Sequence, residues 1–149
     1  MIAHHVVAAA LAIGLAAPAA YVALDRSPCT VVKSVELLTP AVYPGGRLRW
    51  SIVVDRHAMC EYHRTAYLKD GAKTIINYDP VDLGASGNVE NNASLVLEET
   101  IPERATPGPA EYFRWGHYRK SVVNDWWPLP PVLVADLKFT ILEPKEHGD

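Results

Sequence analysis

Apolar and polar residues alternate with a period of two along much of this chain, and this alternation constrains the fold more than any other feature. In one segment, four apolar side chains occupy every second position: Leu48, Trp50, Ile52 and Val54. The segments 92–101 and 133–141 repeat the pattern. A period of two places the apolar side chains on one face of an extended strand, whereas a helix needs a period of 3.6. The sequence therefore predicts half-buried β-strands.

Proline and glycine divide the chain into short elements. The 149 residues include 12 prolines and 9 glycines, and turn signals such as Asp70-Gly71 separate neighbouring apolar runs. The predicted strands are 31–38, 47–55, 61–69, 73–78, 92–101, 110–120 and 133–141. This pattern predicts an all-β domain over residues 27–142, a seven-stranded Ig-like (fibronectin-type) antiparallel sandwich, followed by a flexible tail over 143–149. The Cys–Trp–Cys spacing of true immunoglobulin domains is absent, so the likeness concerns architecture only.

The N-terminal residues differ from the rest of the chain. Residues 2–24 contain no Lys, Arg, Asp or Glu, and the apolar stretch from Val6 to Leu24 is 19 residues long. As a helix that rises about 1.5 Å per residue, this stretch spans roughly 28 Å, close to the hydrocarbon thickness of a bilayer. We expect segment 1–26 to be a single-pass transmembrane anchor, with the membrane as partner through residues 2–24. A signal peptide cleaved near Ala17-Pro18-Ala19 is the alternative.

The two cysteines, Cys29 and Cys60, predict one disulfide. A hairpin between 31–38 and 47–55 brings residue 29 near residues 56–60. In the chain-entropy model, closing a loop of this length stabilises the fold by about 3–4 kcal/mol. A disulfide also favours an oxidising compartment, so we expect the domain on the extracytoplasmic, periplasmic side of the membrane.

Flanking charges leave the orientation open. No Lys or Arg precedes the apolar stretch, whereas Arg26 and Lys33 follow it. Under the positive-inside rule, these two cations favour a cytoplasmic domain, against the expectation from the cysteines.

The charge balance argues against nucleic acid as a partner. Residues 25–149 hold all 14 basic and 17 acidic residues, a net charge of −3, whereas nucleic-acid binding needs a basic stripe. The run from Tyr112 to Arg119 mixes aromatic and basic residues, but we expect an ordinary strand there. Phe113 and Trp115 would share one face of this strand, and Tyr112 and Arg114 the other. Arg114 or Arg119 is expected over an aromatic ring.

No catalytic motif is present, and we expect a non-enzymatic protein without a cofactor. The sequence has no Gly-x-Ser-x-Gly, His-Glu-x-x-His or phosphate loop. The acids Glu98, Glu99 and Glu103 lie close together in sequence, but neighbours on a strand face opposite sides. We therefore expect a solvated strand face and a loop rather than a catalytic pair of carboxylates.

Residues 57–63 hold the densest set of potential metal ligands: His57, Met59, Cys60 and His63. Copper sites in β-sandwiches use His, Cys and a weakly bound Met. The order of ligands here differs from the usual Cys–His–Met order, and a disulfide at Cys60 would remove the thiolate. We expect a solvent-facing loop without metal. A periplasmic copper-binding protein is the alternative.

The strongest candidate for a binding surface is the loop 124–131, which pairs two tryptophans with a proline-rich run. Its expected contact residues are Trp126, Trp127, Pro128 and Leu129. Tryptophan is enriched at interface hot spots and at membrane interfaces, and exposed apolar patches often mark partner sites. A protein, a glycan or the membrane interface would fit this loop. Alternatively, at least one indole closes the open end of the sandwich.

Several unspecific features resemble small uncharacterised proteins of tailed phages and prophages. They are the apolar N-terminus, Asp25-Arg26-Ser27-Pro28, the turn Pro44-Gly45-Gly46 and residues 56–60. Those proteins have a short N-terminal membrane segment followed by one Ig-like domain. The resemblance implies a phage or bacterial source and assigns no activity or site residue.

Together, these features predict a membrane-anchored Ig-like binding or adhesion module with an unknown protein or glycan partner. A copper-binding protein and a structural component of a larger assembly are the alternatives.

Overall fold

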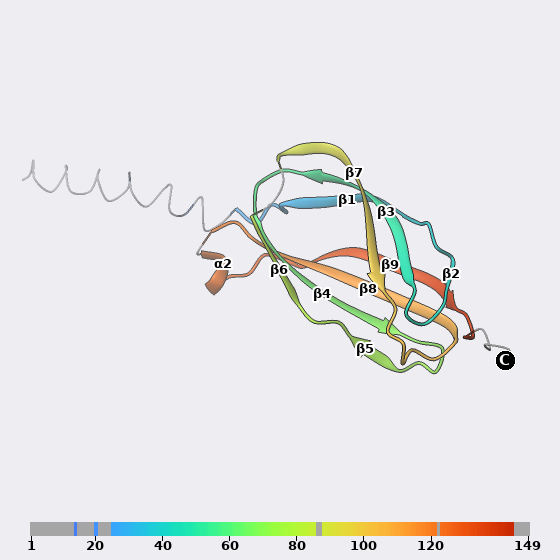
Figure 1. Cartoon of the computed structure of the whole chain (residues 1–149). Coiled ribbons are helices and arrows are strands. Elements are labelled where there is room, and N and C mark those ends of the chain that lie inside the picture. Colours follow the sequence, from blue (N-terminus) through green and yellow to red (C-terminus); the bar gives the residue numbers. More distant parts are fainter. Residues whose placement is uncertain (1–13, 15–19, 21–24, 86–87, 122, 145–149) are drawn as a thin grey trace, which may run out of the picture.

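A computed structural model describes residues 14, 20, 25–85, 88–121 and 123–144. Within these ranges the chain forms nine strands and one helical turn (Figure 1). The strands are β1 (Thr30–Leu37), β2 (Ala41–Val42), β3 (Arg47–Arg56), β4 (Glu61–Lys69), β5 (Ile75–Asn77), β6 (Val81–Ala85), β7 (Glu90–Thr100), β8 (Gly108–Arg119) and β9 (Val132–Ile141). The helical turn α2 (Val123–Trp126) lies between β8 and β9.

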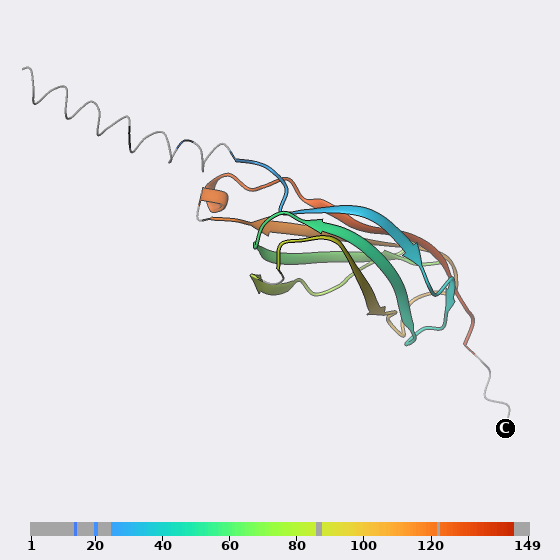
Figure 2. The ribbon, with the colours of Figure 1, turned by 90° about the horizontal axis from the view of Figure 1, so that it is seen from above.

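The strands form two sheets that pack face to face, as the views in Figures 1 and 2 show. One sheet has the order β1-β3-β7, and the other has the order β2-β9-β8-β4-β5, with β6 also paired to β4. The chain changes sheet after β1, β2, β3, β6 and β7. Every pairing is antiparallel except the short parallel pairing of β2 with β9. The expected all-β sandwich is confirmed.

The expected number of strands is wrong: the described ranges hold nine strands rather than seven. Each predicted segment contains a strand, and β2 and β6 are additional. Alternation cannot reveal β2, because it is only two residues long and is defined by its pairing with residues 140 and 141. Alternation cannot reveal β6 either, because four of its five residues are exposed.

The expected transmembrane segment 1–26 lies almost entirely outside the described residues. No helix in the part of the chain that the structure describes is long and apolar enough to cross a bilayer. Of the expected tail 143–149, only residues 143 and 144 are described.

The core between the sheets follows the alternation of β3. Leu48, Trp50, Ile52 and Val54 are all buried, and the Trp50 ring centroid lies 5.3 Å from that of Tyr112 on the opposite sheet. Fully burying a valine, leucine or isoleucine side chain stabilises the fold by about 1.5–3 kcal/mol. The face of β3 that the sequence predicts to be buried is therefore confirmed.

The predicted disulfide is also confirmed. Strands β1 and β3 form the expected antiparallel hairpin, with Thr30 opposite Arg56, and the His57 amide donates to the Cys29 carbonyl at 2.8 Å. The Cys29–Cys60 bond forms across this open end, with 6.3 Å between the two Cα atoms. Because Cys29 precedes β1 and Cys60 precedes β4, the bond joins the two sheets at one end of the sandwich.

Asp70 organises the opposite end. Its side chain is buried and accepts backbone hydrogen bonds from Ala72 (3.1 Å), Thr74 (2.8 Å) and Thr106 (2.9 Å). Burial raises the pKa of this carboxyl, but the hydrogen bonds from Thr106, Thr74 and Ala72 outweigh it and lower the pKa overall. Asp70 therefore fixes both the β4–β5 turn and the loop that leads into β8.

Gly71 allows this close approach. A Cβ atom at Gly71 would lie 2.0 Å from the Pro107 carbonyl oxygen, which is far inside contact distance. Any larger residue would push the β4–β5 turn away from the loop before β8.

Candidate functional site

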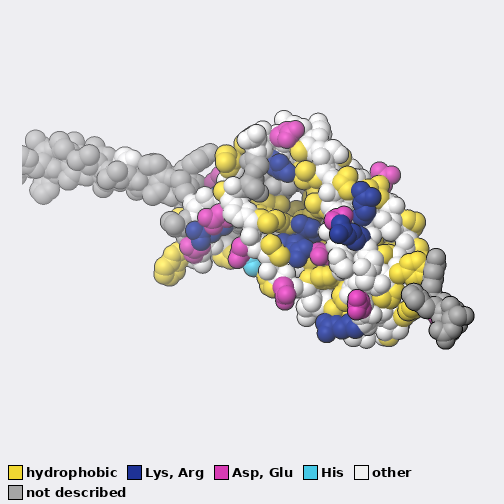
Figure 3. Space-filling view, in the orientation of Figure 1, with side chains coloured by type: hydrophobic (Ala, Val, Ile, Leu, Met, Phe, Trp, Pro, Cys, Tyr) yellow, Lys and Arg dark blue, Asp and Glu magenta, His cyan; other side chains and the backbone are white. Residues whose placement is uncertain are grey.

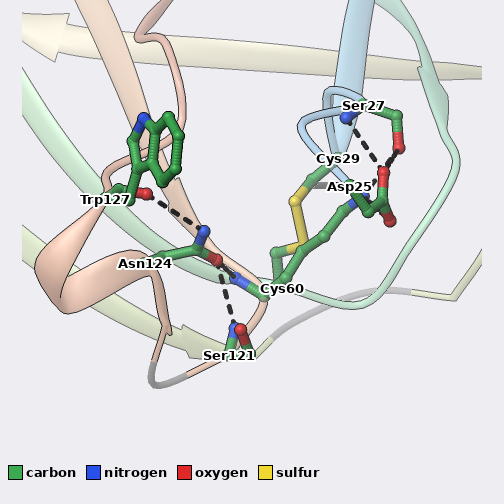
Figure 4. A network of polar contacts seen from close by, with 8 residues as sticks. Asp25, Ser27, Cys29, Cys60, Ser121, Asn124 and Trp127 are labelled. Carbon is green, nitrogen blue, oxygen red and sulfur yellow. Dashed lines mark hydrogen bonds and ion pairs between the residues drawn. A yellow bond between two sulfur atoms is a disulfide. The ribbon is translucent and has the colours of Figure 1, made fainter. Parts of the chain in front are cut away.

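The tryptophan loop, residues 124–131, has a defined conformation that starts at α2. The Asn124 side-chain oxygen accepts hydrogen bonds from the backbone amides of Lys120 (2.8 Å) and Ser121 (3.2 Å). The Trp127 amide donates to the Val123 carbonyl at 2.9 Å. Figure 4 shows Asn124 between the Ser121 backbone and Trp127, close to the disulfide. The Asn124 side chain thus reaches back to amides that precede α2, as the N3 residue of a capping box does.

Most of the predicted contact residues are exposed. Trp126 is 92% exposed and Trp127 is 54% exposed, and Pro128 is also at the surface. Neither indole closes the end of the sandwich, so that alternative is wrong. Leu129 is different, because it is only 5% exposed and packs against the Cys29–Cys60 disulfide. It holds the tryptophan loop on the domain rather than contributing to its outer surface.

The tryptophan loop contacts the residues that immediately follow the N-terminal apolar stretch. The Arg26 guanidinium donates to the Pro128 carbonyl at 2.7 Å and lies over the Trp127 ring, with its Cζ 5.3 Å from the ring centroid. The Lys120 ammonium pairs with Asp25 at 3.1 Å and donates to the Ser27 hydroxyl at 2.9 Å. The exposed indoles therefore lie at the end of the sandwich where the described chain begins (Figure 1).

Asp25 stays ionised under ordinary conditions. Hydrogen bonds from the Ser27 hydroxyl and amide, and then from Lys120, lower its pKa to about 2. The ion pair between Asp25 and Lys120 therefore persists through the physiological range of pH and keeps the start of the domain beside the tryptophan loop.

The residues of the copper alternative do not form a metal-ligand cluster in the part of the chain that the structure describes. His57 and Met59 are exposed, and the Cys60 sulfur is bonded to Cys29 and offers no thiolate. The His63 ring pairs with Asp82 on β6, with 2.5 Å between Nδ1 and Oδ1. Within the described ranges, no group of three or more His, Cys, Asp or Glu residues is placed to hold a metal ion. The residues of the copper alternative are thus spread over a loop and a strand, and their only thiol is oxidised.

His117 lies beside His63 on the neighbouring strand, with 5.9 Å between the ring centroids. Partial burial lowers the pKa of His117, and the neighbouring His63 lowers it further. His117 therefore stays neutral more readily than an ordinary imidazole.

Sequence reasoning missed a cleft between the two sheets, near the disulfide end. Its volume is about 170 Å³. Nine of its fourteen described lining residues are apolar: Val32, Ile52, Val54, Ala58, Cys60, Leu83, Leu95, Leu97 and Val134. Its polar lining residues are Thr30, Arg56, Tyr62, Arg114 and Tyr118, and the lining that the structure describes contains no carboxylate. In the space-filling view, hydrophobic side chains on this face surround basic ones (Figure 3).

Arg114 is the unusual residue of this cleft, because it is only 8% exposed. As predicted, it shares a strand face with Tyr112 and lies over an aromatic ring, with its Cζ 5.9 Å from the Trp50 ring centroid. Its Nε donates to the Tyr62 hydroxyl over a long 3.4 Å. The alternation identified residues that share a face but did not show that this face points inward.

Glu99 corrects another expectation. It faces inward rather than lying on a solvated strand face, and its side chain is 14% exposed. Its carboxylate pairs with Arg64 and accepts a hydrogen bond from the Tyr112 hydroxyl at 3.0 Å. Burial, followed by the charge of Glu99, raises the pKa of Tyr112 far above its ordinary value, so this hydroxyl remains a donor. The sequence did contain a signal. Alternate positions from Ala93 to Ile101 are apolar except for Glu99, which places Glu99 on the apolar face of the strand.

Comparisons with known proteins assign no family. No family model matches the chain, and no curated protein matches its sequence. Similar solved structures include an alkylpurine DNA glycosylase, AlkC, from Pseudomonas fluorescens in complex with DNA that contains an abasic site analogue. It has a TM-score of 0.44 and 9% identity over 78% of this chain and 31% of that protein.

Two further similar structures come from other bacteria. Spo0M, a sporulation control protein from Bacillus subtilis, has a TM-score of 0.46 and 8% identity over 79% of this chain and 51% of its own. The β-glucosidase EmGH1 from Erythrobacter marinus has a TM-score of 0.42 and 9% identity over 76% of this chain and 15% of its own. The chain thus spans about half of these proteins or less, and likenesses this weak carry no argument about function.

Proposed function

We propose that this protein is a non-enzymatic, membrane-tethered binding module on the extracytoplasmic side of a bacterial membrane. We further propose that the tryptophan loop contacts the bilayer interface. The order β1-β3-β7 facing β9-β8-β4 supports Ig-like architecture for the domain. The Cys29–Cys60 disulfide supports an oxidising compartment. A bacterial or phage source belongs to the same proposal and rests on the resemblance of the sequence alone.

One observation carries the lipid contact: Trp126 and Trp127 are exposed, and Trp127 and Pro128 contact Arg26, which directly follows an apolar stretch long enough to span a bilayer. If residues 6–24 span the membrane, Asp25 and Arg26 lie at its surface. Trp126 and Trp127 then lie at the depth where tryptophan is enriched, since its ring is apolar and its N–H needs a polar partner.

The test uses the full chain reconstituted in vesicles whose lipids carry a fluorescence quencher at the level of the headgroups. We expect this quencher to reduce the tryptophan emission, and acrylamide in the water to have little effect on Trp126. Replacing both indoles, W126S and W127S, should remove the lipid-dependent quenching. The matched control is I75S, which changes a 62% exposed apolar residue on β5, away from the tryptophan loop.

Two results would contradict the proposal in different ways. If an alkaline wash releases the chain from the vesicles, the tether itself is wrong. If the chain stays bound but acrylamide quenches Trp126 and the lipid quencher does not, the indoles face water. The tryptophan loop would then be available to a protein, a glycan or a second copy of the chain.

A further inference from the structure

We propose that the cleft between the sheets is a binding site for a small organic carboxylate, with Arg114 receiving the carboxylate and the apolar walls enclosing its hydrocarbon part. This inference is independent of the tryptophan loop and of the membrane tether.

The charge of Arg114 is the first argument. Taking a guanidinium out of water costs several kcal/mol unless an opposite charge and hydrogen bonds replace the lost hydration. Arg114 is more than nine-tenths buried, yet within the described ranges its contacts are one long hydrogen bond to Tyr62 and the face of Trp50. A neutral hydroxyl and a ring face compensate only part of that cost.

No carboxylate among the described neighbours forms an ion pair with the Arg114 guanidinium. Glu99 shares the inner face of β7 with the cleft residues Leu95 and Leu97, but its carboxylate is engaged by Arg64 and Tyr112. The lining that the structure describes includes no carboxylate. An anion is therefore the missing partner of the Arg114 guanidinium.

The surroundings of Arg114 fit a carboxylate. A guanidinium presents its N–H groups as a planar fork that matches the two oxygens of a carboxylate. Arg56 and the hydroxyl groups of Thr30, Tyr62 and Tyr118 line the same cleft. Burial raises the pKa of Tyr118, so this hydroxyl remains protonated at neutral pH. Another cationic residue and three hydroxyl-bearing residues thus line the same cleft as Arg114.

The size and polarity of the walls define the rest of the ligand. A cleft of about 170 Å³ is close to the apolar cavities of about 150 Å³ that accept a benzene-sized molecule. Its walls carry methyl groups from Val32, Ile52 and Leu95, among others. The site therefore fits a monocarboxylate with an aromatic ring or a short alkyl chain, such as benzoate or hexanoate. The source is either a free acid or the acid end of a larger molecule.

The experiment uses the full chain in lipid nanodiscs with isotope-labelled methyl groups, titrated with benzoate and hexanoate. We expect saturable NMR shifts in the methyl groups of Val32, Ile52 and Leu95, and no shift at Ile75 on β5. The neutral amides, benzamide and hexanamide, have nearly the same shape and partition at least as well into lipid. The affinity of these amides should be lower than that of the carboxylates by about tenfold or more, since the amides lose the charge-assisted contact.

Variants test the role of the guanidinium. R114Q should reduce the affinity for the carboxylates about tenfold or more, while R49Q, which changes an exposed arginine on β3 without altering the cleft, should not. L95W fills the cleft and should abolish the shifts even if R114Q fails to fold.

Three results would overturn the inference. They are the absence of shifts in the cleft of the wild-type chain, equal binding of the amides, and unchanged carboxylate binding in a folded R114Q variant. Longer acyl carboxylates that bind more tightly than hexanoate would identify the acid end of a larger molecule as the source.

Discussion

Among individual residues, Asp70 shows how one buried carboxylate can define a loop region. Three backbone amides from two separate segments donate to its two oxygens. These hydrogen bonds are part-buried, so removing the carboxylate leaves three partly shielded donors without this acceptor.

We expect D70A to lower the free energy of unfolding by about 2–4 kcal/mol, because each unsatisfied buried amide costs about 1–3 kcal/mol and the loop can relax in part. Urea unfolding followed by circular dichroism measures this difference. The control D79A changes an exposed aspartate whose side chain makes no hydrogen bond to the described residues, and it should leave the unfolding midpoint unchanged. Equal midpoints for both variants would show that Asp70 is dispensable.

Stability should decline in acid for a related reason. Asp25, Asp55 and Asp70 all have a pKa below the ordinary value of 3.8 in the folded chain. For Asp55, the hydrogen bonds from Lys33 and from the Asn92 amide are responsible. These carboxyl groups bind protons more readily in the unfolded chain than in the folded chain. The stability that they contribute is therefore complete above about pH 4 and is lost as the pH falls toward about 2.

Urea midpoints measured across this range should therefore decrease with falling pH, and D70N should make the decrease shallower than in the wild type. A flat profile below about pH 4 would contradict the assignment of these three carboxylates.

At the scale of elements, the sequence predicted strands best where one face is apolar and the other polar. β3 is such a strand, and its inner face was predicted residue by residue. β8 is not, since both of its faces are aromatic: Phe113 stacks on Tyr67 at 4.9 Å outside the core, while Tyr112 packs against Trp50 inside. Hydrophobicity could not tell its faces apart, so the inward direction of Arg114 stayed hidden.

The candidate site was predictable only in part for similar reasons. The tryptophans lie between Asn124 and Pro128, and the sequence marked this loop as a candidate but left open whether both indoles are exposed. The burial of Leu129 depends on the disulfide beneath it, and the cleft depends on the spacing of two sheets. Neither follows from local pattern, because both arise from contacts between segments far apart in sequence.

The disulfide acts on the β1–β3 hairpin and its connection to β4. We expect the double variant C29A/C60A to lose about 3–4 kcal/mol of stability, since the bond closes a loop with a sequence separation of 31 residues in the unfolded chain. Unfolding with and without a reducing agent gives the same comparison in the wild type. If reduction leaves the midpoint unchanged, the bond does not restrain the unfolded chain.

For the whole molecule, the proposed topology predicts that the domain is outside the cytoplasm. When the full chain is expressed in a bacterium, protease added to intact spheroplasts should digest the domain, and alkylation should find no free thiol. A chain that lacks residues 1–24 should stay protected and carry two free thiols, because the cytoplasm is reducing. Protection of the full chain would place the domain inside the cell.

The disulfide also determines how the domain would carry a mechanical load. The described chain enters beside Cys29, and its C-terminal end lies at the other end of the sandwich (Figure 2). A pull between these ends would pass from Cys29 through the sulfur–sulfur bond to Cys60 and directly into β4. The segment between the two cysteines would not be pulled out. With a sequence separation of 31 residues, this segment would lengthen the molecule by roughly 100 Å if it were fully extended. Force on the tether would therefore enter the larger sheet through β4 and leave the β1–β3 hairpin unstretched.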